Sequence, residues 1–341
     1  TQTPSATTRY PRVFRKTSGD VTVHIWGAHL YRSDLGGMVN NSTTGDSYVT
    51  TTSSAVYLPR VGHHIYNGST WVNEGVLHES KARTNLLLNS GTLATQSVTV
   101  TATSTTLSFT GTGTVTLTGV STAGPLVGTG TGENNRVNLT FTPTAGTLTL
   151  TVSGTVTNAQ LEAGETPSSY IPTAGATATR AAETLTVPTA NLPYSSTNMS
   201  IQMDGSITYA DTSNTNEVFF WNWTLNSSNN MKAHLDTNVS KVGKPTWVQK
   251  SGNVTDNITN ASGSTYSPGI NVPFNLASRH GSNFINGAAD GTSFTVNATP
   301  TSLPDLSASD LTLGGTFMGT IGKFIVWSDD LTDVGIEEAS T

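Results

Sequence analysis

The sequence predicts an all-β protein made of tandem antiparallel β-sandwiches, and two observations support this prediction. The first is composition: the 341 residues are 35% hydrophobic and only 11% charged, and they include 33 glycines. Threonine and valine, which are frequent, favour strands, whereas serine, asparagine and glycine favour turns. The second is an alternation of apolar and polar residues over long runs, with turn-forming residues about every ten positions.

Composition also excludes several classes of function. The formal net charge of -6 argues against a nucleic-acid-binding protein, which normally has a basic face. The chain contains no cysteine, so neither a disulfide framework nor a thiolate metal site is possible. No apolar run approaches the roughly 18 residues that a membrane helix needs, so we expect no membrane insertion. The chain begins at Thr1 rather than Met, which is consistent with a processed piece of a longer protein.

Residues 84–173 are predicted to form the first complete sandwich. Their apolar residues alternate with threonine and serine, which is typical of strands that bury one face. The alternating apolar positions are Val98, Val100, Leu107, Phe109, Val115, Leu117, Val137, Leu139, Phe141, Leu148, Leu150 and Val152. The glycines at 111, 113, 128, 130 and 132 precede no helix, so we interpret them as hairpin and loop glycines rather than a phosphate-binding loop.

This segment offers little for acid–base catalysis. Its titratable side chains are few, namely Glu133, Arg136, Glu162 and Glu165. General acid–base chemistry and glycoside hydrolysis both need paired titratable groups in one cleft. The chain also lacks a serine nucleophile elbow, HExxH and a P-loop, so we expect no enzyme activity.

The first sandwich is followed by residues 158–180, NAQLEAGETPSSYIPTAGATATR. Glycines and prolines at 164, 167, 172 and 175 prevent a helix, so we expect an extended strap that Tyr170 and Ile171 pin to the sandwich. AQLE-x-G followed by SSYIPT and TR resembles the closing signature of jelly-roll, carbohydrate-binding-like modules in tailed-bacteriophage structural proteins. The resemblance implies that residues 84–173 form such a jelly roll and that residues 174–187 form a linker strap.

The N-terminal residues are predicted to belong to an earlier, similar module. Residues 1–35 contain two predicted strands around a turn at 17–20, and GAHLYRSDLGG resembles a variant of the closing signature. Residues 1–35 are therefore interpreted as the end of an upstream β-module. Residues 36–83 are expected to form an ordered connector.

Two features of this connector predict local structure. Its large apolar side chains, namely Tyr57, Tyr66, Trp71 and Leu77, are too many to leave in water, so we expect them to be buried. His63, His64 and His78 could hold a metal ion, but their spacing fits no metal motif. The alternative is that these histidines make interdomain hydrogen bonds.

Residues 188–341 are predicted to form the second sandwich. Strands are expected at 199–210, 218–225, 231–236 and 246–251. Several later elements resemble the laminin-G or concanavalin-A-like lectin sandwich as it occurs in phage proteins. They are an Ala-x-Arg strand ending at Arg279, the pair Asn286 and Gly287, a Leu-x-Leu-Gly-Gly strand at 311–315, and a last strand with Gly319, Ile321 and Trp327. The resemblance implies a carbohydrate-binding-like fold that ends in a short helix.

Seven residues of this module are candidate sugar contacts, because aromatic faces stack on sugar rings and polar side chains bind hydroxyls. They are Trp221, Asn222, Trp223, Trp247, Arg279, His280 and Asp290. The alternative interpretation places Phe219, Trp221 and Trp223 in the core, with Phe220 on the opposite face and Trp327 also in the core. The resemblance also implies calcium at loop carboxylates, for which Asp290 or Asp305 is available, although calcium needs about six oxygens.

The leading functional hypothesis is a structural protein of a tailed-phage virion, as a capsid decoration, head-fibre or tail-fibre component at the particle surface. The expected partners are other virion proteins, further copies of the chain, with a trimer as one form, and host-surface polysaccharide. The alternative hypothesis is a secreted bacterial carbohydrate-binding protein without catalytic activity. A polysaccharide depolymerase is a third hypothesis, which the missing catalytic motifs disfavour.

Overall fold

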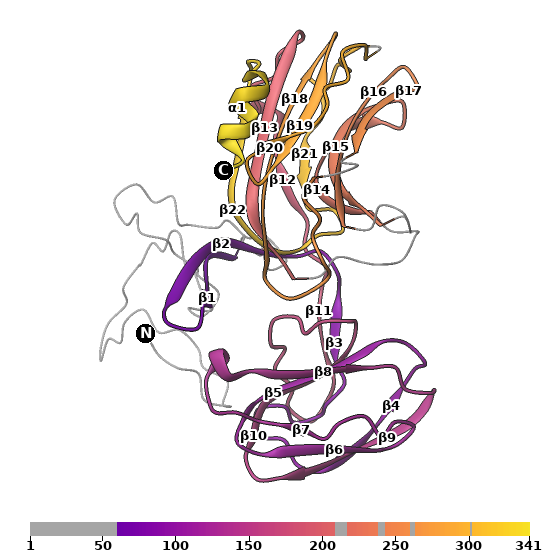
Figure 1. Cartoon of the computed structure of the whole chain (residues 1–341). Coiled ribbons are helices and arrows are strands. Elements are labelled where there is room, and N and C mark those ends of the chain that lie inside the picture. The colour runs from indigo at the N-terminus through magenta and orange to yellow at the C-terminus, as the bar shows by residue number, and fades with distance from the viewer. Residues whose placement is uncertain (1–59, 209–216, 238–242, 260–262, 301) are drawn as a thin grey trace, which may run out of the picture. The chain divides into compact units, whose positions relative to one another are not determined.

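The structure is a computed structural model, and it describes residues 60–208, 217–237, 243–259, 263–300 and 302–341 (Figure 1). These residues belong to one compact unit, Pro59–Thr341. Their strands pair antiparallel in two pairs of sheets and one short ribbon, so the predicted all-β fold of tandem sandwiches is confirmed. The predictions for residues 1–35 and for residues 36–59 of the connector lie outside the described residues.

The first sandwich packs a three-stranded sheet, in the order β10–β5–β8, against a four-stranded sheet, in the order β4–β9–β6–β7. Its strands are β4 (Gln96–Val100), β5 (Thr105–Gly111), β6 (Thr114–Gly119), β7 (Leu126–Val127), β8 (Val137–Phe141), β9 (Gly146–Ser153) and β10 (Val156–Ala163). The predicted apolar residues meet between the sheets, where Leu107, Phe109 and Leu148 are fully buried. Threonines such as Thr116 and Thr151 face outward from the four-stranded sheet.

Two glycine-containing segments of this sandwich lie against each other. Gly111 and Gly130 exchange backbone hydrogen bonds of 2.6 and 3.0 Å, and Gly128 N donates to Gly113 O at 2.8 Å. Gly111 has a φ of +125°, and a Cβ atom there would collide with the carbonyl oxygen of Thr155. Only glycine permits this backbone conformation and this close approach. The glycine at 113 lies in the connection between β5 and β6 and those at 128, 130 and 132 lie in the loop between β7 and β8, as predicted, whereas Gly111 is the last residue of β5.

The second sandwich packs a seven-stranded sheet, in the order β1–β2–β22–β13–β18–β19–β20, against a six-stranded sheet, in the order β12–β21–β14–β15–β16–β17. The first sheet contains β1 (Arg60–Tyr66), β2 (Trp71–Glu79), β13 (Asn198–Ile207), β18 (Val272–Gly281), β19 (Ile285–Ala289), β20 (Thr292–Ser293) and β22 (Met318–Trp327). The second contains β12 (Leu185–Val187), β14 (Val218–Asn226), β15 (Asn229–Asp236), β16 (Lys244–Ser251), β17 (Val254–Thr259) and β21 (Leu311–Leu313). A ribbon of β3 (Arg83–Asn85) and β11 (Ala178–Arg180) flanks the first sandwich in sequence.

The second sandwich begins earlier in the chain than the sequence predicts. Residues 60–79 are predicted as connector, but β2 pairs with β22, for example at Val76 and Ile321, and so joins the seven-stranded sheet (Figure 1). Residues 174–187, predicted as a linker, likewise contribute β12, which pairs with β21. The pairing covers an edge of β22 that would otherwise expose unpaired backbone groups. The first sandwich is therefore inserted between two parts of the second.

A β-bulge in β14 changes which aromatic side chains enter the core. The register with β15 shifts between Phe219 and Trp221, so Phe220 lies in the core together with Trp221 and Trp223. Phe219 is half-buried and contacts the His234 ring instead. The predicted strict alternation, with Phe220 facing away from the core, is wrong because a bulge inserts one extra residue into the strand.

A second bulge lies in β22. Its register with β13 shifts between the partners of Asp204 and Gly205, which leaves Gly322 without a partner in that ladder. Phe324 and Val326 consequently pack against the core. Trp327, predicted as a core residue, is half-buried and does not belong to the core cluster.

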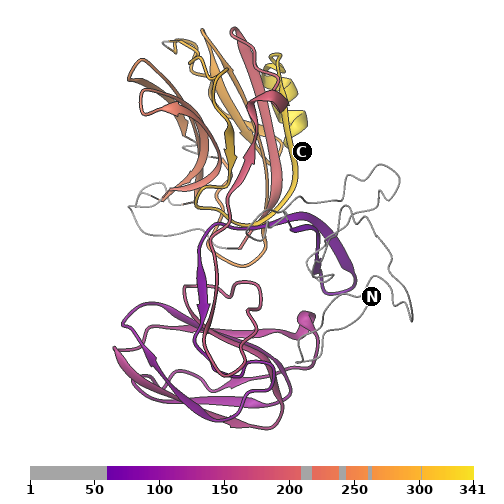
Figure 2. The same ribbon diagram turned by 180° about the vertical axis from the view of Figure 1, so that it is seen from behind.

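Helix α1 (Thr332–Ala339) packs on the seven-stranded sheet (Figure 2). Its Ile336 side chain is fully buried against Ala277 of β18 and Ala288 of β19, in a small cluster separate from the main core. Two single 3-10 turns, η2 (Glu133–Asn135) and η3 (Thr189–Asn191), complete the helical structure of the described residues. None of the helices described is long and apolar enough to cross a membrane.

Candidate functional site

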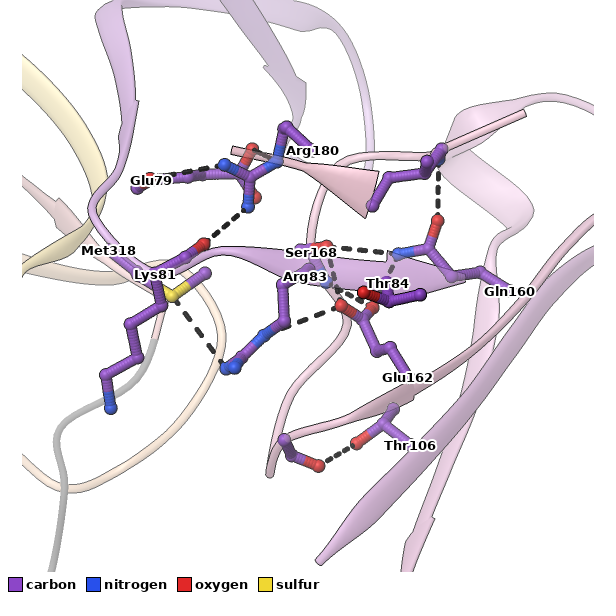
Figure 3. Close-up of polar contacts among 12 residues, drawn as sticks. Glu79, Lys81, Arg83, Thr84, Thr106, Gln160, Glu162, Ser168, Arg180 and Met318 are labelled. Atoms are coloured by element: carbon purple, nitrogen blue, oxygen red, sulfur yellow. Dashed lines mark hydrogen bonds and ion pairs between the residues drawn. The ribbon is translucent and has the colours of Figure 1, made fainter. Parts of the chain in front are cut away.

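The signature residues AQLE supply a buried polar cluster on β10. Gln160 and Glu162 are fully buried, and they alternate with the core residues Ala159 and Leu161. The Gln160 amide donates to Glu162 Oε1 at 2.6 Å and to Ser168 Oγ at 3.0 Å (Figure 3). Gln160 Oε1 accepts from the backbone of the strap, at Ile171 N, at 2.6 Å. The glutamine therefore ties β10 to the strap that follows it.

Both side-chain oxygens of Glu162 bind the same strap, at Ser168. Its Oε1 accepts from Ser168 N at 2.8 Å, and its Oε2 accepts from Ser168 Oγ at 2.7 Å. Arg83 Nε lies 3.5 Å from Glu162 Oε2 and supplies the opposite charge. A buried carboxylate is tolerated only when it is paired and hydrogen-bonded, and the strap and β3 meet both conditions.

The bulky residues of the strap anchor it as predicted. Ile171 is almost completely buried. The Tyr170 hydroxyl lies 2.7 Å from Ser90 Oγ, and Thr173 N donates to that same oxygen at 2.8 Å. The prediction that Tyr170 and Ile171 pin the strap to the first sandwich is confirmed.

A second polar group, which we call the junction cluster, consists of Arg60, Glu79, Ser169, Arg180 and Glu183. Glu79 is almost completely buried, and its Oε2 lies 2.7 Å from Arg60 and 3.2 Å from Arg180. Ser169 donates to Glu79 through its backbone N at 2.8 Å and its hydroxyl at 2.5 Å. Arg60 also contacts Glu183 at 2.8 Å. The cluster links β1, β2, the strap and β11.

The electrostatics of the junction cluster are those of a structural ion-pair network rather than of a catalytic site. Burial alone would raise the pKa of Glu79, but the charges of Arg180 and Arg60 and the hydrogen bonds from Ser169 outweigh burial and lower it. Glu79 is therefore ionised at neutral pH, and both of its oxygens are engaged. A general base needs a carboxylate free to take a proton from a substrate, which this geometry does not offer.

The three tryptophans predicted as sugar contacts lie in the core of the second sandwich. Trp221, Trp223 and Trp247 are each at most 1% exposed. Trp223 Nε1 donates to the Ser309 carbonyl at 2.8 Å, and the Trp247 ring packs on Phe294 with 5.1 Å between centroids. These rings present no exposed face on which a sugar could stack. Their sugar contact stays a prediction, and their burial favours the alternative interpretation as core residues.

Arg279, another candidate, is occupied by carboxylates of the chain. Its Nε and NH2 bind the two oxygens of Asp330 at 2.7 Å each, and its NH1 binds Asp333 at 2.8 Å. Asn286 Nδ2 donates to the same Asp333 oxygen at 2.8 Å. Burial would raise the pKa of Asp333, but the hydrogen bonds from Asn286 and Arg279 lower it overall. These contacts dock the start of α1 onto β18 and β19.

The remaining candidates lie in different parts of the second sandwich. His280 is fully buried, and burial lowers its pKa to about 3. Asn222 is half-buried on β14, and its Oδ1 accepts from the Thr224 hydroxyl at 2.6 Å. Asp290 is exposed beside the turn between β19 and β20. The seven predicted residues therefore do not form one surface.

Asp290 and Asp305 do not fit the calcium site that the resemblance implies. Asp290 accepts from Asn275 N at 3.2 Å and from the Tyr266 hydroxyl at 3.0 Å. Asp305 accepts from the backbone N and the hydroxyl of Ser307 at 3.0 and 2.7 Å. Across the described ranges, no group of three or more His, Cys, Asp or Glu side chains is placed to hold a metal ion. Neither aspartate thus has the further carboxylates with which proteins usually reach six calcium ligands.

The β1–β2 hairpin exposes aromatic side chains that the sequence predicts to be buried. Trp71 is 50% exposed and Tyr66 is 38% exposed. The prediction of burial is wrong for these two, because only residues 76–79 of β2 pair with β22 and the outer half of the hairpin extends past that pairing. His78 lies in the paired half, is buried, and bonds the Gly314 carbonyl at 2.9 Å through Nε2. Because β2 belongs to the second sandwich, this bond lies within that sandwich and is not the interdomain bond that the alternative predicts.

Comparison with known proteins gives similarity to part of the chain only. No protein-family model matches it, and no curated protein sequence matches it. Among solved structures, a leech intramolecular trans-sialidase complexed with 2,7-anhydro-Neu5Ac has 18% identity and a TM-score of 0.34, over 43% of this chain and 23% of its own. The CBM40 of a Ruminococcus gnavus IT-sialidase, bound to α2,6 sialyllactose, has 15% identity and a TM-score of 0.34, over 43% and 85%. A heptameric SAP-like pentraxin from Limulus polyphemus has 9% identity and a TM-score of 0.32, over 43% and 73%.

Proposed function

We propose that the chain is a non-catalytic structural protein of a tailed-phage virion, exposed at the particle surface as a capsid decoration, head-fibre or tail-fibre component. The proposal rests on the contacts that the polar residues of the phage-like signature make. Five polar residues of the signature form hydrogen bonds or ion pairs that hold the strap and the neighbouring strands together. They are Gln160, Glu162, Ser168, Ser169 and Arg180. A motif whose polar residues bind only the protein itself serves architecture rather than a substrate.

The rest of the chain supports a role that is mechanical rather than chemical. Glu79 and Glu162 are the buried carboxylates of the described residues, and the oxygens of both are bound by arginine and serine side chains. The outward face of the four-stranded sheet of the first sandwich carries uncharged threonine and serine. We further propose assembly with other virion proteins and with copies of the same chain, a trimer being one form, and contact with host-surface polysaccharide.

Immunogold electron microscopy of purified phage particles, with antibody against this chain, tests the proposal. Label on the capsid supports a decoration or head-fibre protein, and label at the tail tip supports a tail-fibre component. Absence of the chain from purified particles by mass spectrometry, together with absence of label, would overturn the virion proposal. Light scattering of the purified protein tests the oligomer, and a strict monomer would exclude the trimer.

A secreted bacterial carbohydrate-binding protein is the second candidate. The exposed pair of Tyr66 and Trp71 favours it, because exposed aromatic rings are a common means of holding sugars and do not depend on a virion. The gene context decides between the two candidates. A secretion signal encoded upstream of this chain, without neighbouring virion genes, would favour the secreted protein.

A further inference from the structure

One face of the outer β1–β2 hairpin carries four exposed side chains that are aligned across the two strands. Tyr66 is directly opposite Trp71, and two positions further along, His64 is directly opposite Asn73. No register shift separates the two pairs, so all four side chains project from the same face. All four residues are exposed. The Tyr66 and Trp71 rings lie 5.5 Å apart, tilted by 54°, and form an apolar platform.

The polar pair beside this platform is oriented by local hydrogen bonds. His64 Nδ1 lies 2.8 Å from the Gly62 carbonyl, which can only accept, so in the neutral ring Nδ1 carries the proton and Nε2 is left as an acceptor. Asn73 Oδ1 accepts from Gly75 N at 2.8 Å, which leaves the Nδ2 group as a donor. An acceptor and a donor therefore stand side by side next to two aromatic rings.

This combination of groups matches a neutral pyranose. The axial C–H face of such a sugar is apolar and packs on aromatic rings, while two neighbouring hydroxyls can donate to one group and accept from another. None of the four side chains carries a carboxylate, an ammonium or a guanidinium group, so nothing in the set selects a charged sugar. We propose that Tyr66, Trp71, His64 and Asn73 form a binding site for neutral pyranose units of a polysaccharide.

The opposite face of the hairpin is a natural comparison. There Val72, which is 38% exposed, lies opposite Ile65, and this pair offers no polar group. An interface between two copies of the chain needs only apolar area, as the Ile65–Val72 pair offers, whereas the aromatic rings have an oriented donor and acceptor beside them. The polar pair is thus the observation that favours a sugar over a second copy.

This inference rests on the glycan contact within the proposed function, and it is independent of the virion assignment. The probe is a panel of neutral hexasaccharides built from glucose, galactose, mannose or N-acetylglucosamine, titrated into the purified chain by calorimetry. We expect at least one to bind with a dissociation constant in the micromolar to millimolar range, as is usual for a small exposed site. Trp71→Ala should weaken that binding at least tenfold, and Asn73→Ala about fivefold, as expected for one hydrogen bond.

Val72→Ala is the matched control, because it truncates an exposed side chain of the same hairpin on the other face. It should leave binding unchanged, and circular dichroism should show that all three variants keep the wild-type fold. Binding that survives Trp71→Ala would overturn this site while leaving glycan contact in place. No binding of any panel member to the wild type would overturn both the site and neutral glycan contact, and immunogold labelling would still decide the virion assignment. A dimer or trimer that Trp71→Ala dissociates in light scattering would make this face an interface between copies and overturn the sugar site.

Discussion

Glu79 connects residues that lie about a hundred positions apart, and its charge stabilises the junction cluster. Its pKa is lowered in the folded protein, so its contribution to stability is present above the unfolded value near 4.3 and is lost as pH falls through the folded value. Glu79→Gln should reduce the free energy of unfolding by about 3 kcal/mol at pH 7, because two partly buried arginines lose the carboxylate that they share. Urea unfolding at pH 7 and at pH 3.5 measures this effect, which should shrink at the lower pH.

Glu133→Gln is the matched control for that experiment. Glu133 forms an exposed ion pair with Arg136 three residues away, which is worth less than about 1 kcal/mol. An equal loss of stability in both variants would contradict a special role for the junction cluster.

The burial of His280 leads to a separate prediction, on how the free energy of unfolding depends on pH. Burial lowers its pKa to about 3, so the folded protein keeps it neutral while the unfolded chain takes up a proton below about pH 6.5. This residue should therefore lower the free energy of unfolding by about 2 kcal/mol between pH 8 and pH 5. The change is measured by tryptophan fluorescence, since Trp221, Trp223 and Trp247 lie in the same core. His280→Gln should unfold with a shallower pH dependence over that interval, and an unchanged slope would contradict the assignment.

Gly111 allows the close approach of two segments in the first sandwich. Gly111→Ala should destabilise that sandwich by at least about 2 kcal/mol, because alanine disfavours a φ of +125° and its Cβ would strike the Thr155 carbonyl. Hydrogen exchange of β5 and β10 measures the loss. Gly91→Ala is the control, since a Cβ there meets open space and the backbone does not require glycine. Equal protection in the two variants would contradict the steric argument.

The strands were largely predictable from the sequence, whereas their irregularities were not. The predicted strands at 218–225, 231–236 and 246–251 match β14, β15 and β16 to within two residues at either end. The bulges at Phe220 and Gly322 are defined by the register with a partner strand, β15 for Phe220 and β13 for Gly322, and the local sequence pattern does not indicate them. They explain why Phe220 is in the core and Trp327 is not.

The junction cluster could not be predicted for a similar reason. The signature identified Ser169 and Arg180 as notable residues, but their shared partner Glu79 lies in a segment that resembled a connector. Only the pairing of β2 with β22 brings that segment into the second sandwich. The candidate sugar residues were chosen by side-chain type, and type alone does not separate a buried tryptophan from an exposed one such as Trp71.

At the scale of the whole molecule, the second sandwich should depend on residues that precede the first. A chain shortened to begin at Arg83 lacks β1, β2 and Glu79, and it leaves the edge of β22 unpaired. We expect it to melt at a lower temperature and to aggregate, because an open strand edge pairs with other chains. Thermal unfolding and size-exclusion chromatography measure this, with a chain beginning at Arg60 as the control. Equal behaviour of the two chains would show that the second sandwich does not depend on β1 and β2.

The pairing of β2 with β22 also means that β2 is synthesised long before the strand with which it pairs. Glu79 leaves the ribosome well before its partner Met318, and the first sandwich is made in between. At translation rates of about 5–20 residues per second, this interval lasts roughly ten to fifty seconds. Throughout it, β2 has an unsatisfied edge while the first sandwich is already free to fold. Nascent chains halted in that interval should therefore be the form of this protein that chaperones bind most strongly.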